Sequence, residues 1–156
     1  SLTGLNNRRN MEKYFKMHGA GGQPGAVAII VIDINDFKQI NDRYGHNAGD
    51  EALIRAADIL RITFNGTPAF LSRYGGDEFV ILMPDSDERN VEEAVHKIEA
   101  NFAQFSEAEQ FPFRLAVSIG HAISTGKEQN RIADLIGEAD ENMYREKARY
   151  HHQSES

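Results

Sequence analysis

Three carboxylates stand where the sequence predicts strands to end or turn. Asp33 follows the apolar run 26–32, while Asp77 and Glu78 follow the glycine pair 75–76 between two apolar segments. A glycine pair between strand-like runs indicates a tight hairpin, because only glycine enters positive φ at low cost. Taken alone, this short motif is more often a bare hairpin turn with one exposed acid than a functional site.

A strand that pairs with this hairpin would bring the three acids into one small volume. Negative charges at such short distances repel one another and make each carboxyl group harder to ionise. Cations between the acids would remove this electrostatic cost. Carboxylate oxygens without nearby His or Cys favour Mg²⁺ or Mn²⁺, which keep waters and bind substrate phosphates. The pattern therefore favours metal-assisted phosphoryl or nucleotidyl transfer, with three solvated acids at a sheet edge as the alternative.

A second group of polar residues follows Asp33. Lys38 and Asn41 lie three residues apart, hence on one face of a predicted short helix, and Asp50 is expected at the start of the next helix. Guanine presents the donors N1–H and N2–H₂ beside its O6 acceptor, and a carboxylate together with an amide can bind these groups. Adenine does not present this pattern, because its N1 is an acceptor and it has no 2-amino group. Asn41 with Asp50 is therefore a candidate guanine reader, and Lys38 a phosphate contact. Singly, Asp50 is more often a helix cap and Lys38 a solvated charge.

Composition bounds the class of protein. The 156 residues, 40% hydrophobic and 26% charged, suit one domain, with residues 1–150 as the domain and 151–156 as a frayed tail. A net charge of −7 argues against nucleic acid or an anionic membrane as a partner. The chain has no cysteine, membrane span or signal peptide, so a cytoplasmic location is expected. It begins at Ser1 rather than Met, so we expect a fragment whose sensory, receiver or anchoring segments lie outside this sequence.

Apolar periodicity and turn residues predict the elements that position these groups. Asn6 or Asn7 is expected to cap a first helix that ends at about His18, and Asp36 is expected to cap the short helix. Further helices are predicted over residues 36–44, 50–64, 88–105 and 132–149, with a break between the first two over 45–49. Strands are predicted over residues 26–32, 69–74, 78–83 and 113–123. This order indicates an α/β (α+β) fold with a βαββαβ core, whose mixed, mostly antiparallel sheet of about five strands is flanked by helices.

Several long motifs in this order resemble the GGDEF domain of bacterial diguanylate cyclases. The matching stretches are residues 2–9, 33–42, 44–50 and 73–79, to which the last helix adds Ala139, Asp140, Met143, Tyr144 and Lys147. The likeness covers nearly the whole chain. It implies the palm-like fold of nucleotidyl cyclases and polymerases, and synthesis of cyclic di-GMP from two GTP.

The resemblance also implies residue roles. By this resemblance, two Mg²⁺ (or Mn²⁺) ions per active site are expected to bind to Asp33, the main-chain carbonyl of Ile34, Asp77 and Glu78. Asp77 matches the catalytic base and Lys38 a lysine that stabilises the transition state. Guanine contacts match Asn41 and Asp50, and phosphate contacts match Phe37, Lys38 and Lys147. Each domain would hold one GTP, so a productive pair requires a second copy of the domain, as a homodimer.

The chain departs from the family pattern at several positions. Residues 66–69 stand where many relatives carry an Arg-x-x-Asp inhibition site, so feedback through that site is predicted to be absent. Residues 150–152 replace the closing Gly-Arg-Asn, and Asn35 stands where many relatives have a second aspartate. Arg73 is either a ligand contact or a strand-edge charge. Two alternatives to an active diguanylate cyclase stay open: a GTP-binding regulatory domain with little turnover, and a cyclase that makes a mononucleotide ring.

Overall fold

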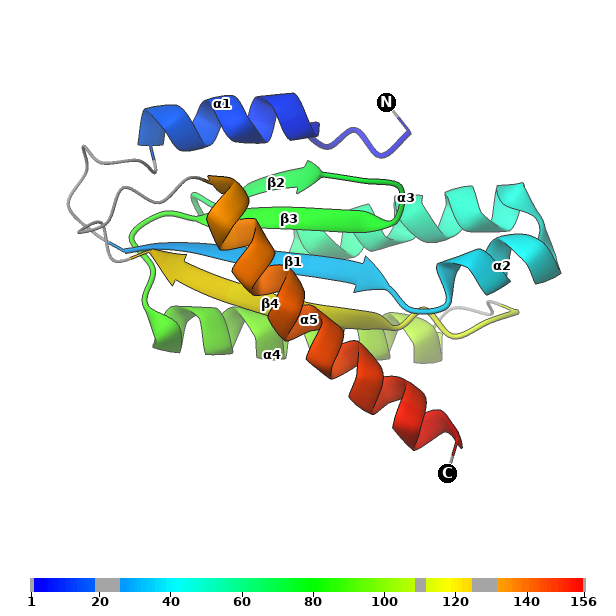
Figure 1. The fold of residues 1–156 in the computed structure, drawn as a ribbon. Helices are drawn as coiled ribbons and strands as arrows, with labels where there is room; N and C mark the ends of the chain where they lie inside the picture. The colour runs from blue at the N-terminus through cyan, green and yellow to red at the C-terminus, as the bar shows by residue number, and fades with distance from the viewer. Residues whose placement is uncertain (1, 19–25, 109–111, 125–131, 156) are drawn as a thin grey trace.

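The computed structural model describes residues 2–18, 26–108, 112–124 and 132–155 (Figure 1). Within these ranges the chain forms five helices and four strands. In chain order they are α1 (Arg8–His18), β1 (Val27–Ile34), α2 (Phe37–Tyr44), α3 (His46–Thr63), β2 (Phe70–Arg73), β3 (Glu78–Met83), α4 (Glu88–Ala108), β4 (Val117–Ser124) and α5 (Ile132–Glu155). None of these helices is long and apolar enough to cross a membrane.

The strands form one sheet in the order β2-β3-β1-β4, and every neighbouring pair runs antiparallel. The α/β (α+β) fold with its βαββαβ core is confirmed. The expected mixed sheet of about five strands is corrected: the described residues contain four strands, and their parallel pairing is limited to an isolated bridge between Asn6 and Ser72. Residues 113–116, predicted to begin the last strand, lie outside β4.

The apolar strand β1 lies inside the sheet and is covered on both faces, as its sequence predicts. All eight of its residues are buried. Ile30 and Ile32 belong to the core with α3 and α4, whereas Ile29 and Val31 belong to the core with α1 and α5. Figure 1 shows α5 on one face of the sheet and α3 and α4 on the other. Because successive side chains alternate between faces, Asp33 lies on the face that α5 covers.

Most helix positions that the apolar pattern assigns to the core are buried. Tyr14, Val95, Phe105 and Ile132 are only partly buried. The buried positions that confirm the pattern are Met11 and Phe15 in α1, Leu53, Ala57 and Leu60 in α3, Phe64 directly after α3, Val91, Ile98 and Phe102 in α4, and Leu135, Ile136, Ala139 and Met143 in α5.

Local backbone chemistry sets the starts of the first two helices. Asn7 caps α1 as predicted, because its side-chain oxygen accepts a hydrogen bond from the main-chain N–H of Asn10 at 2.8 Å. Asp36 precedes α2 in a left-handed conformation, with φ of 57°, and makes no side-chain capping bond. The prediction that the Asp36 side chain caps this helix is therefore wrong.

Two helix boundaries also differ from the prediction. Gly45, with φ of 95°, alone separates α2 from α3, so residues 46–49 are helical instead of forming a break. Asp50 therefore lies inside α3 and not at its start. At the other end of the chain, α5 continues to Glu155, so residues 151–155 extend the helix where the sequence suggested a frayed tail.

Gly120 sets how closely α5 approaches the sheet. A Cβ added at Gly120 would overlap the main-chain oxygen of Ala139 and the main chain of Met143, both in α5. Lys147 lies one turn beyond Met143 on the same helix face. The missing side chain at Gly120 therefore lets α5 bring Lys147 close to the end of β1.

We expect Gly120→Ala to destabilise the fold by about 1–3 kcal/mol, because the new methyl group has to displace helix backbone. Gly137→Ala is the control: Gly137 is an exposed position of α5 with no atom within 4 Å of an added Cβ. That change should stabilise the domain by up to about 1 kcal/mol. Urea unfolding of both variants measures the difference, and equal stabilities would show that α5 does not need this close approach.

Candidate active site

Three of the predicted acids meet where β1 ends and β3 begins. Asp33 and Glu78 are direct partners in the β1–β3 ladder, so both side chains lie on the α5 face of the sheet. Asp77 immediately precedes β3, and its main-chain oxygen accepts a hydrogen bond from Ile34 N–H at 3.3 Å. The predicted convergence of these residues is present in the structure, while their chemical roles stay predictions.

A cation and a fourth acid come from α5. The amino group of Lys147 donates a hydrogen bond to Asp33 Oδ2 at 2.7 Å, across 114 positions of sequence. Asp140 contributes negative charge that acts on Glu78. The resemblance quotes Asp140 in a motif, yet sequence reasoning gave it no role. Asp140 lies three residues before the core residue Met143, on a helix that packs over the acids. This spacing is the signal from which Asp140 could have been placed beside Glu78.

Burial and crowding make the acids hard to ionise. Burial, followed by the hydrogen bond with Asp77, raises the pKa of Asp33 to about 6 although Lys147 acts to lower it. Burial and then the charges of Asp140 and Asp33 raise the pKa of Glu78 to about 7. Burial also raises the pKa of Asp140. The cluster therefore carries more negative charge than its protein partners offset.

Lys147 responds in the opposite sense. Burial lowers the pKa of Lys147, but its hydrogen bond and charge interaction with Asp33 outweigh that effect, so the pKa is raised overall. Lys147 is therefore protonated at neutral pH and neutralises one edge of the Asp33 carboxylate. The other oxygen, Asp33 Oδ1, is buried and has no hydrogen-bond partner among the described residues.

The hairpin turn beside the acids is held by its own main chain. The N–H groups of Tyr74 and Gly75 donate to the carbonyl of Glu78 at 2.8 and 3.3 Å. The guanidinium of Arg73 donates twice to the carbonyl of Gly76, at 3.1 and 2.8 Å. Arg73 thus holds the turn from the end of β2, while a ligand contact at this position stays a prediction.

The glycine pair does not serve the backbone in the way predicted. Neither Gly75 nor Gly76 has a φ in the left-handed region, so the expectation of positive φ at this turn is wrong. A Cβ added at Gly76 would have no atom within 4 Å, and one at Gly75 would only touch the Glu78 Cβ at 3.7 Å. The turn itself tolerates side chains, so the glycines leave open surface next to the acids.

The donor set suits a hard divalent cation, although the side chains are not arranged as a ready-made metal centre. No three His, Cys, Asp or Glu side chains in the described ranges are grouped so that they could hold a metal ion. Lys147 occupies one oxygen of Asp33, and the second oxygen is the buried, unpartnered atom. An oxygen in that position fits Mg²⁺ or Mn²⁺, because a cation would satisfy it and offset the excess negative charge.

The candidate nucleotide contacts lie at the same end of the sheet, since α2 follows directly after β1 (Figure 1). Lys38 and Asp50 are exposed. The amide of Asn41 lies against Gly49, where an added Cβ would overlap it, so Asn41 is held beside the first turns of α3 that carry Asp50. Phe37 packs its side chain against the core, so a phosphate contact at this position would fall to its main-chain N–H.

Comparison with known proteins gives a consistent match. The sequence model of the family described as "Diguanylate cyclase, GGDEF domain" matches residues 1–153. The response regulator PleD of Caulobacter vibrioides is 37% identical over an alignment of 156 positions, which covers 94% of this chain and 33% of PleD. The diguanylate cyclase DosC of Escherichia coli K12 is 32% identical over 154 residues, which cover 95% of this chain and 32% of DosC.

A solved structure shows the same fold. The GGDEF domain of DgcB from Caulobacter crescentus, determined in complex with c-di-GMP, has a TM-score of 0.84 and 25% identity, covering 95% of this chain and 88% of that one. The chain spans about a third of the length of the curated relatives PleD and DosC.

We expect Glu78→Gln to stabilise the metal-free domain, because glutamine cannot carry the charge that burial and neighbouring acids penalise. Glu78 is partly exposed, so solvent screening reduces the gain to about 1 kcal/mol, or about 2–4 °C in Tm. A raised folded-state pKa costs stability as pH rises from 4.5 towards 7, so the gain should be small at pH 5 and full at pH 8.

Thermal unfolding in EDTA at the two pH values measures this difference. Glu92→Gln, at an exposed position of α4, controls for the change in net charge. A Glu78→Gln variant no more stable than the parent at pH 8 would contradict the electrostatic description of the cluster.

Proposed function

The chain belongs to the GGDEF domain family of diguanylate cyclases, and we propose from this membership and from its acid cluster that it condenses two GTP into cyclic di-GMP and pyrophosphate. One observation carries the proposal most directly. Asp33, 8% exposed, lies opposite Glu78, and one of its carboxylate oxygens is buried without a hydrogen-bond partner in the part of the chain that the structure describes. A domain that only had to fold would gain by replacing these charges.

The acids of the cluster would act as ligands for the family's metal ions. Asp33, the main-chain carbonyl of Ile34, Asp77 and Glu78 would hold two Mg²⁺ or Mn²⁺ ions per active site. Such ions supply a lowered pKa for the attacking hydroxyl and stabilise charge on the transferring and leaving oxygens.

The remaining residues position GTP. Asn41 and Asp50 read the guanine edge, which holds the nucleotide at the α2–α3 junction. Lys38, Lys147 and the main-chain N–H of Phe37 contact the phosphates. Lys147 can leave Asp33 for a phosphate oxygen without losing a negatively charged partner, and Lys38 is solvent-exposed and free to turn towards the substrate.

Two such sites face each other in the reaction. The 3′-oxygen of one GTP forms a bond to the α-phosphorus of the other, the bond to the pyrophosphate group breaks, and the hydroxyl proton passes to Asp77. The reciprocal attack closes the ring. Each domain holds one GTP, so a homodimer is required, and regulatory segments outside this sequence can control turnover by setting the effective concentration of the second domain.

A GTP-binding regulatory domain with little turnover is the second candidate. The residues Tyr150, His151 and His152 favour it, because they stand where the family has a phosphate-binding arginine. Product analysis separates the two functions, and it also separates both from a cyclase that releases cyclic GMP.

The direct test uses the domain fused behind a dimeric coiled coil, with GTP and Mg²⁺, and product analysis by mass spectrometry. We expect cyclic di-GMP from the parent and none from Asp77→Ala, because that change removes the base. The melting temperature of the variant should change little. Glu92→Ala, at an exposed site of α4, should retain the parent's activity. Bound GTP without product would favour the regulatory domain, and turnover by Asp77→Ala would remove Asp77 from the mechanism.

The base-reading role of Asp50 is tested by selectivity. Asp50→Ala should lower the preference for GTP over ATP by about tenfold or more, because a charge-assisted hydrogen bond to the guanine edge is lost. Glu51→Ala is the matched control. Glu51 is the next acid of the same helix and pairs with Arg55 at 2.8 Å, so its loss should leave selectivity unchanged. Equal selectivity in the parent and Asp50→Ala would refute the assignment.

A further inference from the structure

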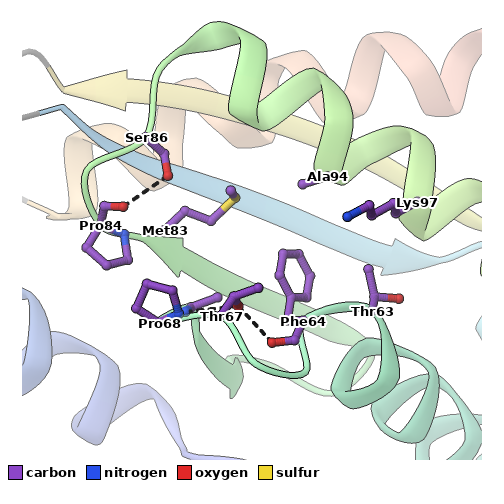
Figure 2. Close-up of a pocket in the computed structure, with 10 residues that line it drawn as sticks. Thr63, Phe64, Thr67, Pro68, Met83, Pro84, Ser86, Ala94 and Lys97 are labelled. Atoms are coloured by element: carbon purple, nitrogen blue, oxygen red, sulfur yellow. Dashed lines mark hydrogen bonds between the residues drawn. The ribbon is translucent and has the colours of Figure 1, made fainter.

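A separate pocket lies at the opposite end of β3 from the acids. Its walls come from the end of α3, the loop before β2, the loop after β3, and α4, as Figure 2 shows. It encloses about 110 Å³. A single water molecule needs about 10–15 Å³ by the same measure, so this pocket has room for a group of roughly the size of a phenyl ring. The strand rise places it about 17 Å along β3 from Glu78.

The pocket is mostly apolar. Phe64, Met83 and Ala94 line it together with the rings of Pro68 and Pro84, and Phe64 and Ala94 are themselves buried. In Figure 2 the Phe64 ring and the Met83 side chain both point into the same space. This lining favours an apolar group of a ligand over a sugar or a phosphate.

The hydroxyl groups of the lining do not offer free donors. Ser86 donates its hydroxyl proton to the carbonyl of Pro84 at 3.0 Å, and Thr67 donates to the carbonyl of Phe64 at 2.7 Å, as the dashed lines in Figure 2 mark. Thr63 donates to the carbonyl of Ile59 at 2.8 Å. These protons are already used inside the protein.

The main chain around the pocket is committed in the same way. The N–H of Ser86 donates to the carbonyl of Ala26 at 2.8 Å, and the N–H of Thr67 donates to the carbonyl of Phe64 at 3.1 Å. The N–H of Ala69 donates to the Thr67 hydroxyl at 3.3 Å. The two prolines have no N–H to give. A ligand therefore finds little hydrogen-bonding capacity in this wall.

Lys97 is the exception. Of the described residues that line the pocket it alone carries a charge, and its amino group points into the pocket in Figure 2. Glu93, one turn before it, pairs with Arg89 at 3.5 Å, and Lys97 takes part in no ion pair among the described residues. Asp85 and Asp87 flank Ser86 at the rim, which disfavours a ligand with several negative charges.

We propose that this pocket binds a small apolar monocarboxylate, of the aryl or branched-alkyl class, with its hydrocarbon body against Phe64 and Met83 and its carboxylate on Lys97. One cation matches one negative charge, and the apolar lining matches the remainder of such a molecule. The site is independent of the acid cluster and of GTP, so its occupancy is measured without turnover.

The test uses phenylacetate and its neutral isostere phenylacetamide, observed through ¹³C-methyl methionine NMR. The four methionines of the chain provide internal controls: Met83 lines the pocket, whereas Met11, Met17 and Met143 lie elsewhere. We expect the Met83 methyl signal, assigned with Met83→Leu, to shift with millimolar dissociation constants while the other three stay in place. Phenylacetate should bind about three- to fivefold more tightly than phenylacetamide.

Variants test each half of the recognition. Lys97→Gln should remove the preference for phenylacetate, whereas Lys16→Gln, an exposed lysine of α1, should preserve it. Ala94→Leu should fill the pocket and prevent binding of both compounds. A Met83 signal that does not move at 20 mM probe, equal affinity for the two compounds, or a preference that survives Lys97→Gln would overturn the proposal.

Discussion

Uncompensated negative charge at the junction of β1 and β3 is the constraint on which this structure depends. Asp33 is buried because it continues a strand that is covered on both faces, and the register puts Glu78 directly opposite it. Lys147 offsets part of that charge, and it reaches Asp33 only because Gly120 lets α5 lie close to β4. The electrostatics of the site therefore depend on how closely α5 packs on the sheet.

Sequence patterns were sufficient where one physical rule dominates. The Val- and Ile-rich run before Asp33 had to be an inner strand, and the stripe from Leu53 to Phe64 had to face a core, so the sheet and its helix layers could be predicted. Asp33, Asp77 and Glu78 could be brought together for the same reason, because strand pairing puts strand ends and turns side by side.

The remaining features depend on three-dimensional geometry that cannot be predicted from the sequence pattern. The positive φ angles of Asp36 and Gly45 determine where α2 and α3 begin, and the periodicity of apolar residues gives no sign of them. The ion pair between Lys147 and Asp33 joins residues 114 positions apart, and the place of Asp140 requires knowing which face α5 covers. The glycine pair at the turn was given a backbone role because positive φ is the commonest reason for glycine, yet the structure shows open space instead.

That open space and the charge imbalance support the same conclusion by independent routes. A hairpin that tolerates side chains at positions 75 and 76 has no folding reason to keep them bare, and a cluster in which Asp33 and Glu78 resist ionisation has no folding reason to keep its acids. Glycines that admit a close approach and carboxylates that need positive charge would both be satisfied by the triphosphate and divalent cations that we propose as ligands. The opposite end of β3 differs from this end, because the hydroxyl and main-chain N–H groups of Ser86 and Thr67 there are already paired inside the protein.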